Sequence, residues 1–317
     1  MPSKNLFFGM ITFVFVFALS LAAAEGVVRL KNLDQKNYNI EMWRYSNLLK
    51  MQSDNPDLGH VHRADVSARL EGVELRLNRY GLRGPEIDLS QKKKKILFLG
   101  SSNTLGWGVP EEDTMTSVLE KELGPGVCVM NGGIGNYNTL RYVTLFKEKL
   151  RALHPDVVVV HYFIRDAETL PPGRNNFILR HSELAVLAFS AFQQALNTTN
   201  TLEKLTRYYE VLYEKDAPGY GVMVQSLAEL KRLSEEDGFK VVLAMAPEIH
   251  QMKPYPFRRV HERMGEVARS FGWQFVDLYA PLSAVPSREL WAMAGDPHIN
   301  AKGHHLMAEA LRPSLES

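Results

Sequence analysis

Residues 96–106 read Ile-Leu-Phe-Leu-Gly-Ser-Ser-Asn-Thr-Leu-Gly. The apolar residues predict a short buried strand, and the glycine and serines after them predict a tight turn that opens a helix. A serine hydroxyl in such a turn lies near backbone N–H groups and the positive end of a helix, which stabilise negative charge. Ser102 is therefore a candidate nucleophile, and a polar turn without chemistry is the alternative.

The chain after this stretch alternates short apolar strands with amphipathic helices. Repeated strand–helix units predict an α/β fold, with a parallel sheet between two layers of helices. Ligand sites in such sheets form beyond the carboxyl ends of the strands. Asp113 is a candidate N-cap for the next helix, and Gly124 a stop signal. Strands are expected at residues 127–130, 156–163, 239–246 and 273–279, and helices at 113–123, 139–153, 177–215 (two), 220–236, 256–271 and 301–311.

The N-terminus is strongly apolar. From Leu6 to Ala24, 19 residues carry no charge, close to the ~20 that cross a bilayer as a helix. The alanines at 22–24 resemble a signal-peptidase site, so the segment is either a removed signal peptide or an uncleaved anchor. Its length favours the anchor, with a single N-terminal pass through the cell membrane and the remainder in the periplasm. Secretion after signal cleavage is the alternative.

Three segments are expected along the chain. Residues 1–30 form the signal or anchor segment, residues 31–92 an accessory segment, and residues 93–317 the α/β domain. The accessory segment is polar and mixed, and shows no helical period. Within it, residues 68–78 alternate apolar and polar side chains, which predicts a strand or hairpin, and residues 80–85 predict a turn.

Charge and cysteine content exclude several classes of protein. A formal net charge of +1 produces no field that attracts nucleic acid, so no nucleic-acid partner is expected. The single cysteine, Cys128, excludes an intramolecular disulfide and a Cys-based zinc site. Its place in an apolar strand favours a core role. The turn at Ser102 lacks the P-loop lysine and the G-x-G-x-x-G spacing of nucleotide sites. No metal or cofactor is expected.

Polar residues follow two further strands and precede the last helix. Residues 131–139 read Asn-Gly-Gly-Ile-Gly-Asn-Tyr-Asn-Thr, and their glycines permit close backbone approach to a ligand. The next strand ends at Arg165 and Asp166, which form either a functional pair or an ordinary ion pair. Near the C-terminus, Asp296 precedes His298. Such an aspartate can accept the Nδ1 proton of an imidazole, which leaves Nε2 as a base near neutral pH.

Together these residues resemble the SGNH (GDSL-type) hydrolase superfamily over residues 95–317. The resemblance implies the three-layer SGNH, flavodoxin-like fold and makes Ser102 the nucleophile, with Ser101 in place of the family's usual Asp. The family's second block supplies a backbone donor to the oxyanion, and the matching residue is Gly135 or Asn136. In the third block, Arg165 stands where the family has an Asn whose side chain completes the oxyanion hole.

Two blocks depart from the family pattern. Arg165 either donates to the oxyanion with its fixed charge or fills a surface role, which reduces the hole to two donors. Losing one donor typically costs ~100- to 1,000-fold in rate, so a slow enzyme is an alternative. The fourth block, usually D-x-x-H, is D-x-H at Asp296 and His298. For His304 and His305, packing or capping is favoured over substrate contact.

Two outer features resemble a membrane-associated bacterial subset of the superfamily, whose members are often associated with extracellular polysaccharide. One is the apolar N-terminus followed by Glu25 and Arg29, and the other is Ala-Pro-Glu-Ile-His at residues 246–250. Glu248 either lines the cleft or begins a solvated loop, and the loop is favoured. Trp107 either forms an apolar wall of the site or packs in the core.

The expected activity is that of a serine esterase. His298 takes the Ser102 proton and Ser102 attacks an ester carbonyl. The oxyanion is held by backbone N–H groups of Ser102 and of Gly135 or Asn136, with Arg165 as a further donor. The expected substrate is an O-acyl ester, an O-acetyl ester first, on a carbohydrate. The alternatives are an O-acetyltransferase acting on extracellular polysaccharide and a non-catalytic glycan-binding or assembly protein.

Overall fold

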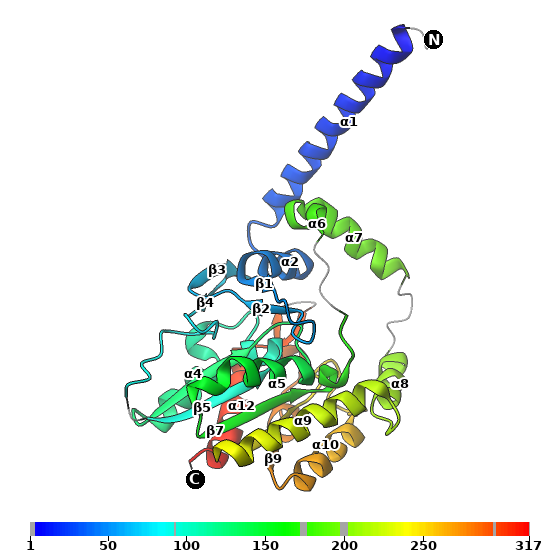
Figure 1. The fold of residues 1–317 in the computed structure, drawn as a ribbon. Helices are drawn as coiled ribbons and strands as arrows, with labels where there is room; N and C mark the ends of the chain where they lie inside the picture. Colours follow the sequence, from blue (N-terminus) through cyan, green and yellow to red (C-terminus); the bar gives the residue numbers. More distant parts are fainter. Residues whose placement is uncertain (1–3, 92, 172–175, 197–201, 294–295, 317) are drawn as a thin grey trace.

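The computed structural model describes residues 4–91, 93–171, 176–196, 202–293 and 296–316, without the side chains of residues 4, 5, 196, 296 and 297. Figure 1 shows the order of the elements in space. The helices are α1 (Lys4–Lys31), α2 (Tyr38–Leu49), α3 (Ser102–Leu105), α4 (Met115–Leu123), α5 (Thr139–Glu148), α6 (Phe177–His181), α7 (Glu183–Leu196), α8 (Leu202–Leu212), α9 (Pro218–Asp237), α10 (Arg258–Ser270), α11 (Tyr279–Ser283) and α12 (Ala301–Leu311). The strands are β1 (Lys50–Gln52), β2 (His60–His62), β3 (Val66–Leu70), β4 (Val73–Leu77), β5 (Lys94–Gly100), β6 (Val127–Gly133), β7 (Val157–Phe163), β8 (Lys240–Ala246), β9 (Gln274–Asp277), β10 (Trp291–Met293) and β11 (Asp296–Ile299).

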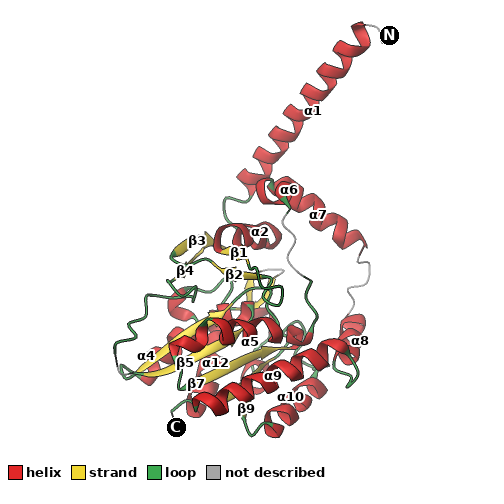
Figure 2. Ribbon diagram, in the orientation of Figure 1, coloured by secondary structure: helices red, strands yellow, loops and turns green. Residues whose placement is uncertain are grey.

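A parallel sheet of five strands forms the centre of the protein, in the order β6-β5-β7-β8-β9. Helices cover both of its faces (Figure 2), so the expected three-layer α/β/α fold is confirmed. The chain leaves β5 to one side for β6 and then crosses to the other side for β7. Open α/β sheets bind ligands at the carboxyl ends of the strands where the order reverses in this way.

The central strands are apolar on both faces, as buried parallel strands are. Ile96 and Phe98 of β5 lie in one buried cluster with side chains of α4 and α12. Leu97 and Leu99 of the same strand lie in the other cluster, with side chains of α5, α9 and α10. Because side chains alternate along a strand, one short apolar run supplies both cores.

The accessory segment contains a helix, α2, that the sequence pattern did not predict. Asn37 caps it, since its side chain accepts the Ile40 N–H at 3.2 Å. The buried face of α2 includes Glu41, whose carboxylate accepts a hydrogen bond from Asn32 at 2.9 Å. The expectation of no helical period in this segment was therefore wrong. The helix was not recognised because a buried carboxylate, which is hydrogen-bonded, interrupts the apolar period.

The hairpin expected at residues 68–78 is confirmed as β3 paired with β4. The turn that follows reaches the edge of the main sheet, because the Arg83 N–H donates to the Asn131 carbonyl of β6 at 3.1 Å. The small antiparallel pairs β1–β2 and β10–β11 were not expected, since three or four residues are too few to show alternation.

Helix boundaries differ from expectation in several places. The helix expected at residues 139–153 ends as α5 at Glu148, and a 3-10 turn follows at Leu150–Leu153. Thr114, not Asp113, is the N-cap of α4, since the Thr114 side chain accepts the Ser117 N–H and Asp113 lies in a 3-10 turn before it. Gly124 ends α4 as expected. Between residues 177 and 215 the described part of the chain forms α6, α7 and α8, where two helices were expected.

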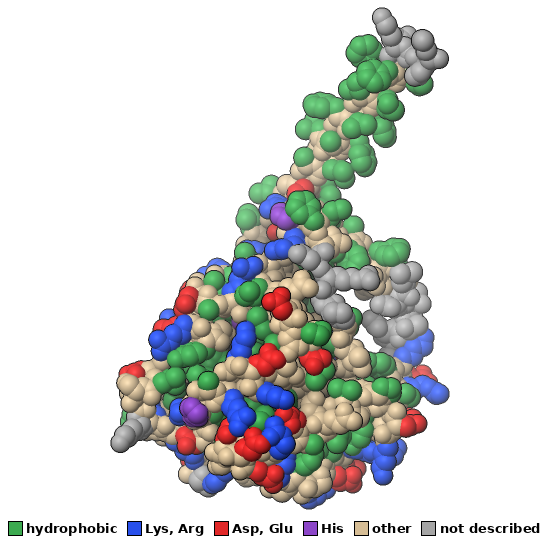
Figure 3. Space-filling view, in the orientation of Figure 1, with side chains coloured by type: hydrophobic (Ala, Val, Ile, Leu, Met, Phe, Trp, Pro, Cys, Tyr) green, Lys and Arg blue, Asp and Glu red, His purple; other side chains and the backbone are tan. Residues whose placement is uncertain are grey.

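Helix α1 projects from the domain (Figure 1). Over Leu6–Lys31 it is long and apolar enough to cross a membrane, and none of its most apolar stretch is buried by the rest of the chain. Figure 3 shows apolar side chains along its visible length. A signal sequence has the same length and composition, so α1 is either a signal segment or a membrane anchor.

The turn after β5 packs directly on the end of β6, and glycine makes this possible. A Cβ atom on Gly133 would lie 2.2 Å from the Leu105 nitrogen, and one on Gly100 would lie 2.6 Å from the His161 carbonyl oxygen. Neither backbone atom can move aside as a flexible side chain would, so both positions exclude a larger residue.

We expect Gly133→Ala to lower the melting temperature by more than about 5 °C, because overpacking against backbone costs about 1–3 kcal/mol or more. Gly126→Ala is the matched control, since a Cβ there meets nothing within 4 Å. Thermal melts of the two variants test this. Equal melting temperatures would contradict the close packing of α3 on β6.

Candidate active site

Ser102 and His298 lie together at the carboxyl edge of the sheet. Ser102 follows β5 as the first residue of α3, and His298 lies in β11 just before α12. The Ser102 Oγ and the His298 Nε2 are 2.8 Å apart. Two groups at this distance can exchange a proton, which is the geometry that general-base activation of a hydroxyl requires.

Asp296 lies two residues before His298 in the same strand, but its side chain lies outside the described residues. The structure therefore places the backbone of this candidate triad member and leaves its role as a prediction. The segment that carries His298 is held by Asn300, which caps α12 through the Gly303 N–H at 3.1 Å and donates to the Glu289 and Trp291 carbonyls.

The turn that carries Ser102 is a single helical turn, shorter than the helix expected to open there. Its C-terminal carbonyls are bound by Arg83 of the accessory segment. The buried guanidinium donates to the carbonyls of Leu105, Gly106 and Val109 at 2.5–2.7 Å. Arg83 thereby satisfies acceptors that a longer helix would have paired with its own N–H groups.

The loop after β6 decides between the two candidate backbone donors. The Gly135 N–H donates to the Tyr45 hydroxyl at 2.9 Å, so it is already occupied. Asn136 lies in the left-handed region, with φ +62°, and lines the cleft beside Ser102. Neither the Asn136 N–H nor the Ser102 N–H has an acceptor within the described part of the chain. Of the two candidates, Asn136 is the one whose N–H is unoccupied, and its role as an oxyanion donor stays a prediction.

Arg165 and Asp166 follow β7 and line the same cleft. The Arg165 Nε and Nη2 donate to the Glu168 carboxylate at 3.0–3.2 Å, so one edge of the guanidinium is committed to this pair. Asp166 is buried, and its Oδ2 accepts the Phe163 N–H at 3.1 Å. Burial raises the pKa of Asp166 well above its usual range.

A cleft of about 430 Å³ opens above Ser102 and His298. Its volume is in the range of sites for small ligands. The lining is aromatic and polar: Tyr38, Met42, Ser101, Ser102, Asn103, Asn136, Tyr137, Phe163, Arg165, Asp166, Glu168, Leu170, Leu205, Tyr208, Tyr209, Glu248, His250 and His298.

The structure also places two further candidates, Glu248 and Trp107. Glu248 lines the cleft, bonded to the His250 Nδ1, so the favoured assignment of Glu248 to a solvated loop was wrong. Its pairing with a histidine two residues on is what retains a carboxylate in a buried position. Trp107 is 1% exposed and packs against Tyr45, so it belongs to the core.

The other late histidines pack and cap, as expected. The buried His304 accepts the Met115 N–H at 3.0 Å through Nδ1, at the start of α4. Burial lowers the pKa of His304 to about 3, so its ring stays neutral. His305 is exposed and lies 3.0 Å from Asp113.

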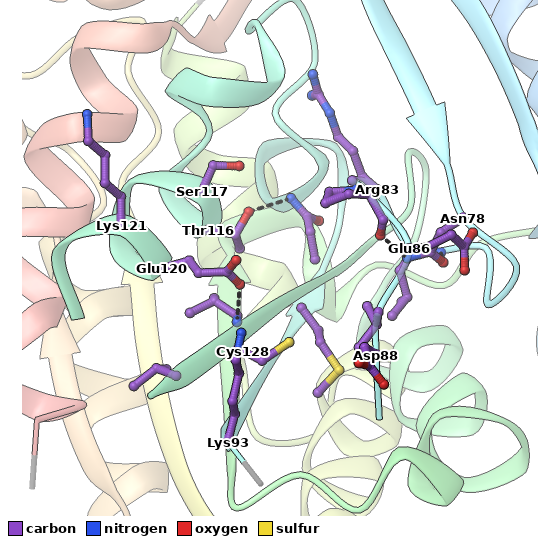
Figure 4. Close-up of a pocket in the computed structure, with 18 of the residues that line it drawn as sticks. Asn78, Arg83, Glu86, Asp88, Lys93, Thr116, Ser117, Glu120, Lys121 and Cys128 are labelled. Carbon is purple, nitrogen blue, oxygen red and sulfur yellow. Dashed lines mark hydrogen bonds between the residues drawn. The ribbon is translucent and has the colours of Figure 1, made fainter. Parts of the chain in front are cut away.

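A larger hollow of about 620 Å³ lies beside the β6 edge of the sheet, away from Ser102 and His298 (Figure 4). Glu120 accepts the Val129 N–H there at 2.7 Å, which pairs an edge-strand donor. Burial, and then the Glu120 charge, raise the pKa of the half-buried Cys128 thiol, so it is not an activated nucleophile. Because no nucleophile–base pair lines this hollow, the chemistry is assigned to the cleft at Ser102.

The chain matches the model of the GDSL-like lipase/acylhydrolase family over residues 98–306. The chain belongs to this family. The expected enzyme class, a hydrolase that acts on ester bonds, is thereby confirmed. The matched range begins within β5 and ends within α12, so it contains Ser102 and His298 but excludes the accessory segment and α1.

Several solved structures are similar to this acylhydrolase at low identity. A lipase/acylhydrolase from Enterococcus faecalis is 15% identical, with 70% of this chain and 95% of that chain covered and a TM-score of 0.42. A member of the lipolytic G-D-S-L family from Veillonella parvula is 15% identical, with 68% and 95% covered and a TM-score of 0.42. An acetyl xylan esterase is 14% identical, with 70% and 99% covered and a TM-score of 0.43. No curated protein sequence matches significantly. These values carry no information on substrate.

The residues of this acylhydrolase that sequence reasoning missed lie mostly in the accessory segment. Arg83, Tyr45 and Lys50 all contact the loops that carry the site. The Gly-Leu-Arg-Gly sequence at residues 81–84 was interpreted only as a turn, although an arginine between glycines is a recognisable signal of close backbone contact. Lys50 and Tyr45 had no comparable signal, because their partners are 85 and 90 residues away.

We expect Arg165→Ala to lower kcat by ~100- to 1,000-fold with little change in KM, because that is the usual effect of removing one oxyanion donor. Arg165→Asn, which restores the family's usual residue, retains activity. Arg232→Ala, an exposed arginine paired with carboxylates on α9, is the matched control. Hydrolysis of p-nitrophenyl acetate measures these effects, and a kcat unchanged in Arg165→Ala would assign Arg165 to the surface pair alone.

Proposed function

We propose that this protein is a serine esterase in which Ser102 is the nucleophile and His298 the general base. The 2.8 Å contact between the Ser102 Oγ and the His298 Nε2 carries this assignment. His298 removes the hydroxyl proton as Oγ forms a bond to the ester carbonyl carbon. The same ring then gives the proton to the leaving alcohol, and an acyl-enzyme remains on Ser102.

The second half of the reaction uses the same groups. Water gives a proton to His298 and attacks the acyl carbon, and the carboxylic acid leaves as His298 returns the proton to Ser102. In each step the negative carbonyl oxygen accepts hydrogen bonds from the N–H groups of Ser102 and Asn136, with Arg165 as the third donor. Asp296 accepts a hydrogen bond from the Nδ1–H group and orients the ring in this account.

The proposed substrate is an O-acyl ester, an O-acetyl ester first, on a carbohydrate. Support comes from the cleft, which combines accessible aromatic rings with charged and polar side chains. The Tyr38 ring lies 5.8 Å from the His298 ring, and Tyr208 is half-exposed on the opposite wall formed by α8. Sugar rings, which have apolar faces and polar edges, fit a lining of this kind better than a long acyl chain does.

The proposed location is the cell membrane, with α1 as a single pass and the catalytic domain in the periplasm. Support comes from the apolar length of α1 and from the lack of contacts that would bury it. Glu25 and Arg29 in its last two turns bond to Ser182 and His181, so the end of the helix is joined to the folded domain.

We expect Ser102→Ala and His298→Ala to lower the hydrolysis of p-nitrophenyl acetate by at least ~1,000-fold, because each removes one half of a nucleophile–base unit. His305→Ala, an exposed histidine on α12, is the control. A fluorophosphonate probe should label the wild-type chain at Ser102 only. Wild-type activity no higher than that of Ser102→Ala, without labelling, would favour a non-catalytic glycan-binding protein.

Peracetylated cellobiose tests two points: whether water or a sugar hydroxyl accepts the acyl group, and whether the alcohol part of the ester is a carbohydrate. Acetate release that is unchanged by added cellobiose supports the hydrolase. Acetyl transfer to the added cellobiose instead supports the O-acetyltransferase, which uses the same acyl-enzyme with a sugar hydroxyl in place of water. No release from the sugar, with p-nitrophenyl acetate still hydrolysed, would contradict the carbohydrate assignment and leave the esterase.

A further inference from the structure

The segment between β7 and α9 carries an exposed apolar face. Phe177 and Ile178 of α6 are 76% and 65% exposed, and Phe189 and Phe192 of α7 are 42% and 60% exposed. The sequence has no charged residue between Glu183 and Glu203. Large exposed apolar side chains on neighbouring helices mark an interaction surface, and α6 and α7 lie beside the base of α1 (Figure 1).

This segment is fixed to the last turns of α1. The Glu25 carboxylate accepts the Ser182 hydroxyl and the N–H groups of Glu183 and Leu184 at 2.8–3.0 Å, so it caps the start of α7. Arg29 donates to the His181 carbonyl at 2.9 Å. The opposite side of the segment packs on the domain, since Leu179 and Val186 form a buried cluster with Ile40 of α2.

We propose that the outer face of α6 and α7, made by Phe177, Ile178, Phe189 and Phe192, docks on the membrane lipid. This rests on the proposed membrane anchor, because α1 determines where the lipid surface meets the domain. A helix with a charge-free face at that level lies in the plane of the interface, with its apolar side ~5–10 Å into the lipid. Leu170 and Leu205, which flank the segment, both line the cleft. The docked segment thus holds the mouth of the active site beside the membrane.

The test uses the full chain in vesicles of phosphatidylcholine and phosphatidylglycerol at 3:1. Single cysteines carry an environment-sensitive fluorophore in a Cys128→Ser background: Phe192→Cys on the proposed face, Phe15→Cys in α1, and Glu235→Cys on α9. Glu235 is exposed, and α9, which carries it, lies far from α1 in Figure 1, so a label there reports the aqueous side. Lipids with a quencher near the headgroup or deep in the chain measure the depth of each label.

The proposal expects strong quenching of the Phe192 label by the shallow quencher, of the Phe15 label by the deep quencher, and none of the Glu235 label. A Phe192 label that behaves like the Glu235 label, with Phe15 still quenched, would retain the anchor and overturn the docking surface. Shielding of the Phe192 label from lipid and from aqueous iodide alike would also overturn it, in favour of a protein partner. An unquenched Phe15 label would remove the anchor and the docking surface together.

A second inference concerns Lys50, a buried cation in the accessory segment. Lys50 is 7% exposed, and no carboxylate of the described chain lies within ion-pair distance of it. Its Nζ donates to the Gly135 carbonyl at 2.6 Å and lies 4.3 Å from the centre of the Tyr45 ring. A buried charge without a carboxylate costs stability, so a role other than stabilisation is the physical reason to retain it.

The same carbonyl has a second donor. The His60 Nε2 lies 3.1 Å from the Gly135 oxygen, and because a carbonyl only accepts, this nitrogen carries the proton. On the preceding peptide, the Gly135 N–H is taken by Tyr45, whose hydroxyl is 2.6 Å from the His62 Nε2. Side chains from α2, β1 and β2 therefore hold both peptide groups of Gly135.

The Gly135 carbonyl belongs to the same peptide group as the Asn136 N–H. A cation on the oxygen withdraws electron density through the amide and makes the N–H a stronger donor, as in polarised chains of hydrogen bonds. We infer that Lys50 is a positioning residue that orients this peptide and strengthens the Asn136 N–H as an oxyanion donor. The inference rests on the proposed serine mechanism and on Asn136 as the backbone donor.

The charge on Lys50 changes within the neutral range. Burial, and then the positive charge of Arg141, lower the pKa of Lys50 to about 7. Burial lowers the pKa of the neighbouring histidines and raises that of the tyrosines, so these stay neutral around pH 7. The titratable and charged side chains that face Lys50 are Tyr45 on α2, His60 and His62 on β2, Arg63 in the loop after β2, and Arg141 on α5.

The lowered pKa of Lys50 predicts how kcat changes with pH. Lys50 is charged below about pH 7 and loses its charge above it. The wild-type kcat for p-nitrophenyl acetate should therefore fall on the alkaline side. Lys50→Met should lower kcat about tenfold at pH 6.5, less than the loss of a whole donor, with KM unchanged, no alkaline fall and no drop in melting temperature.

Two further variants separate charge from packing. Lys50→Arg keeps a charge at high pH, so it should retain kcat and lose only the alkaline fall. Lys36→Met, an exposed lysine in the same segment, should match the wild type throughout. A folded Lys50→Met chain with the wild-type kcat and pH profile would overturn the inference, as would loss of kcat in Lys50→Arg equal to that in Lys50→Met. Phosphonate labelling of Ser102 in each variant separates this failure from failure of the serine mechanism itself.

Discussion

The contact between two backbones at the carboxyl ends of β5 and β6 controls the arrangement of the site. The Ser102 turn lies against Gly133 so closely that a Cβ there would come within 2.2 Å of a turn nitrogen. Because β5 and β6 are adjacent parallel strands, this contact sets Ser102 and the loop of Asn136 at a fixed separation. The proposed oxyanion hole, built from one N–H on each loop, depends on that separation, and His298 reaches it from the last hairpin.

The accessory segment completes this arrangement. Arg83 binds the carbonyls at the end of the Ser102 turn, while Tyr45 and Lys50 bind the two peptide groups of Gly135. The same segment begins where α1 ends, and α2 packs on α6 and α7. The elements that hold the oxyanion loop are thus continuous with those that meet the proposed membrane surface, although the family match covers neither.

The parallel sheet and the Ser102–His298 pair could be predicted because local patterns mark them: apolar runs, glycine turns and a late Asp-x-His. The choice between Gly135 and Asn136 could not, since it depends on a Tyr45 hydroxyl that is 90 residues away. Helix α2 was missed because a hydrogen-bonded Glu41 interrupts its buried face. Glu248 was misassigned because the local sequence does not distinguish a buried carboxylate paired with His250 from one at the start of a solvated loop.

A crystal structure of the chain after reaction with a methyl fluorophosphonate tests the central account most directly. The phosphorus bonded to the Ser102 Oγ mimics the tetrahedral intermediate. The account predicts a phosphonyl oxygen ~2.7–3.1 Å from both the Ser102 and Asn136 nitrogens, with the Lys50 Nζ still on the Gly135 carbonyl. An adduct whose oxygen points to solvent, or which bonds the Gly135 N–H after displacing Tyr45, would contradict it.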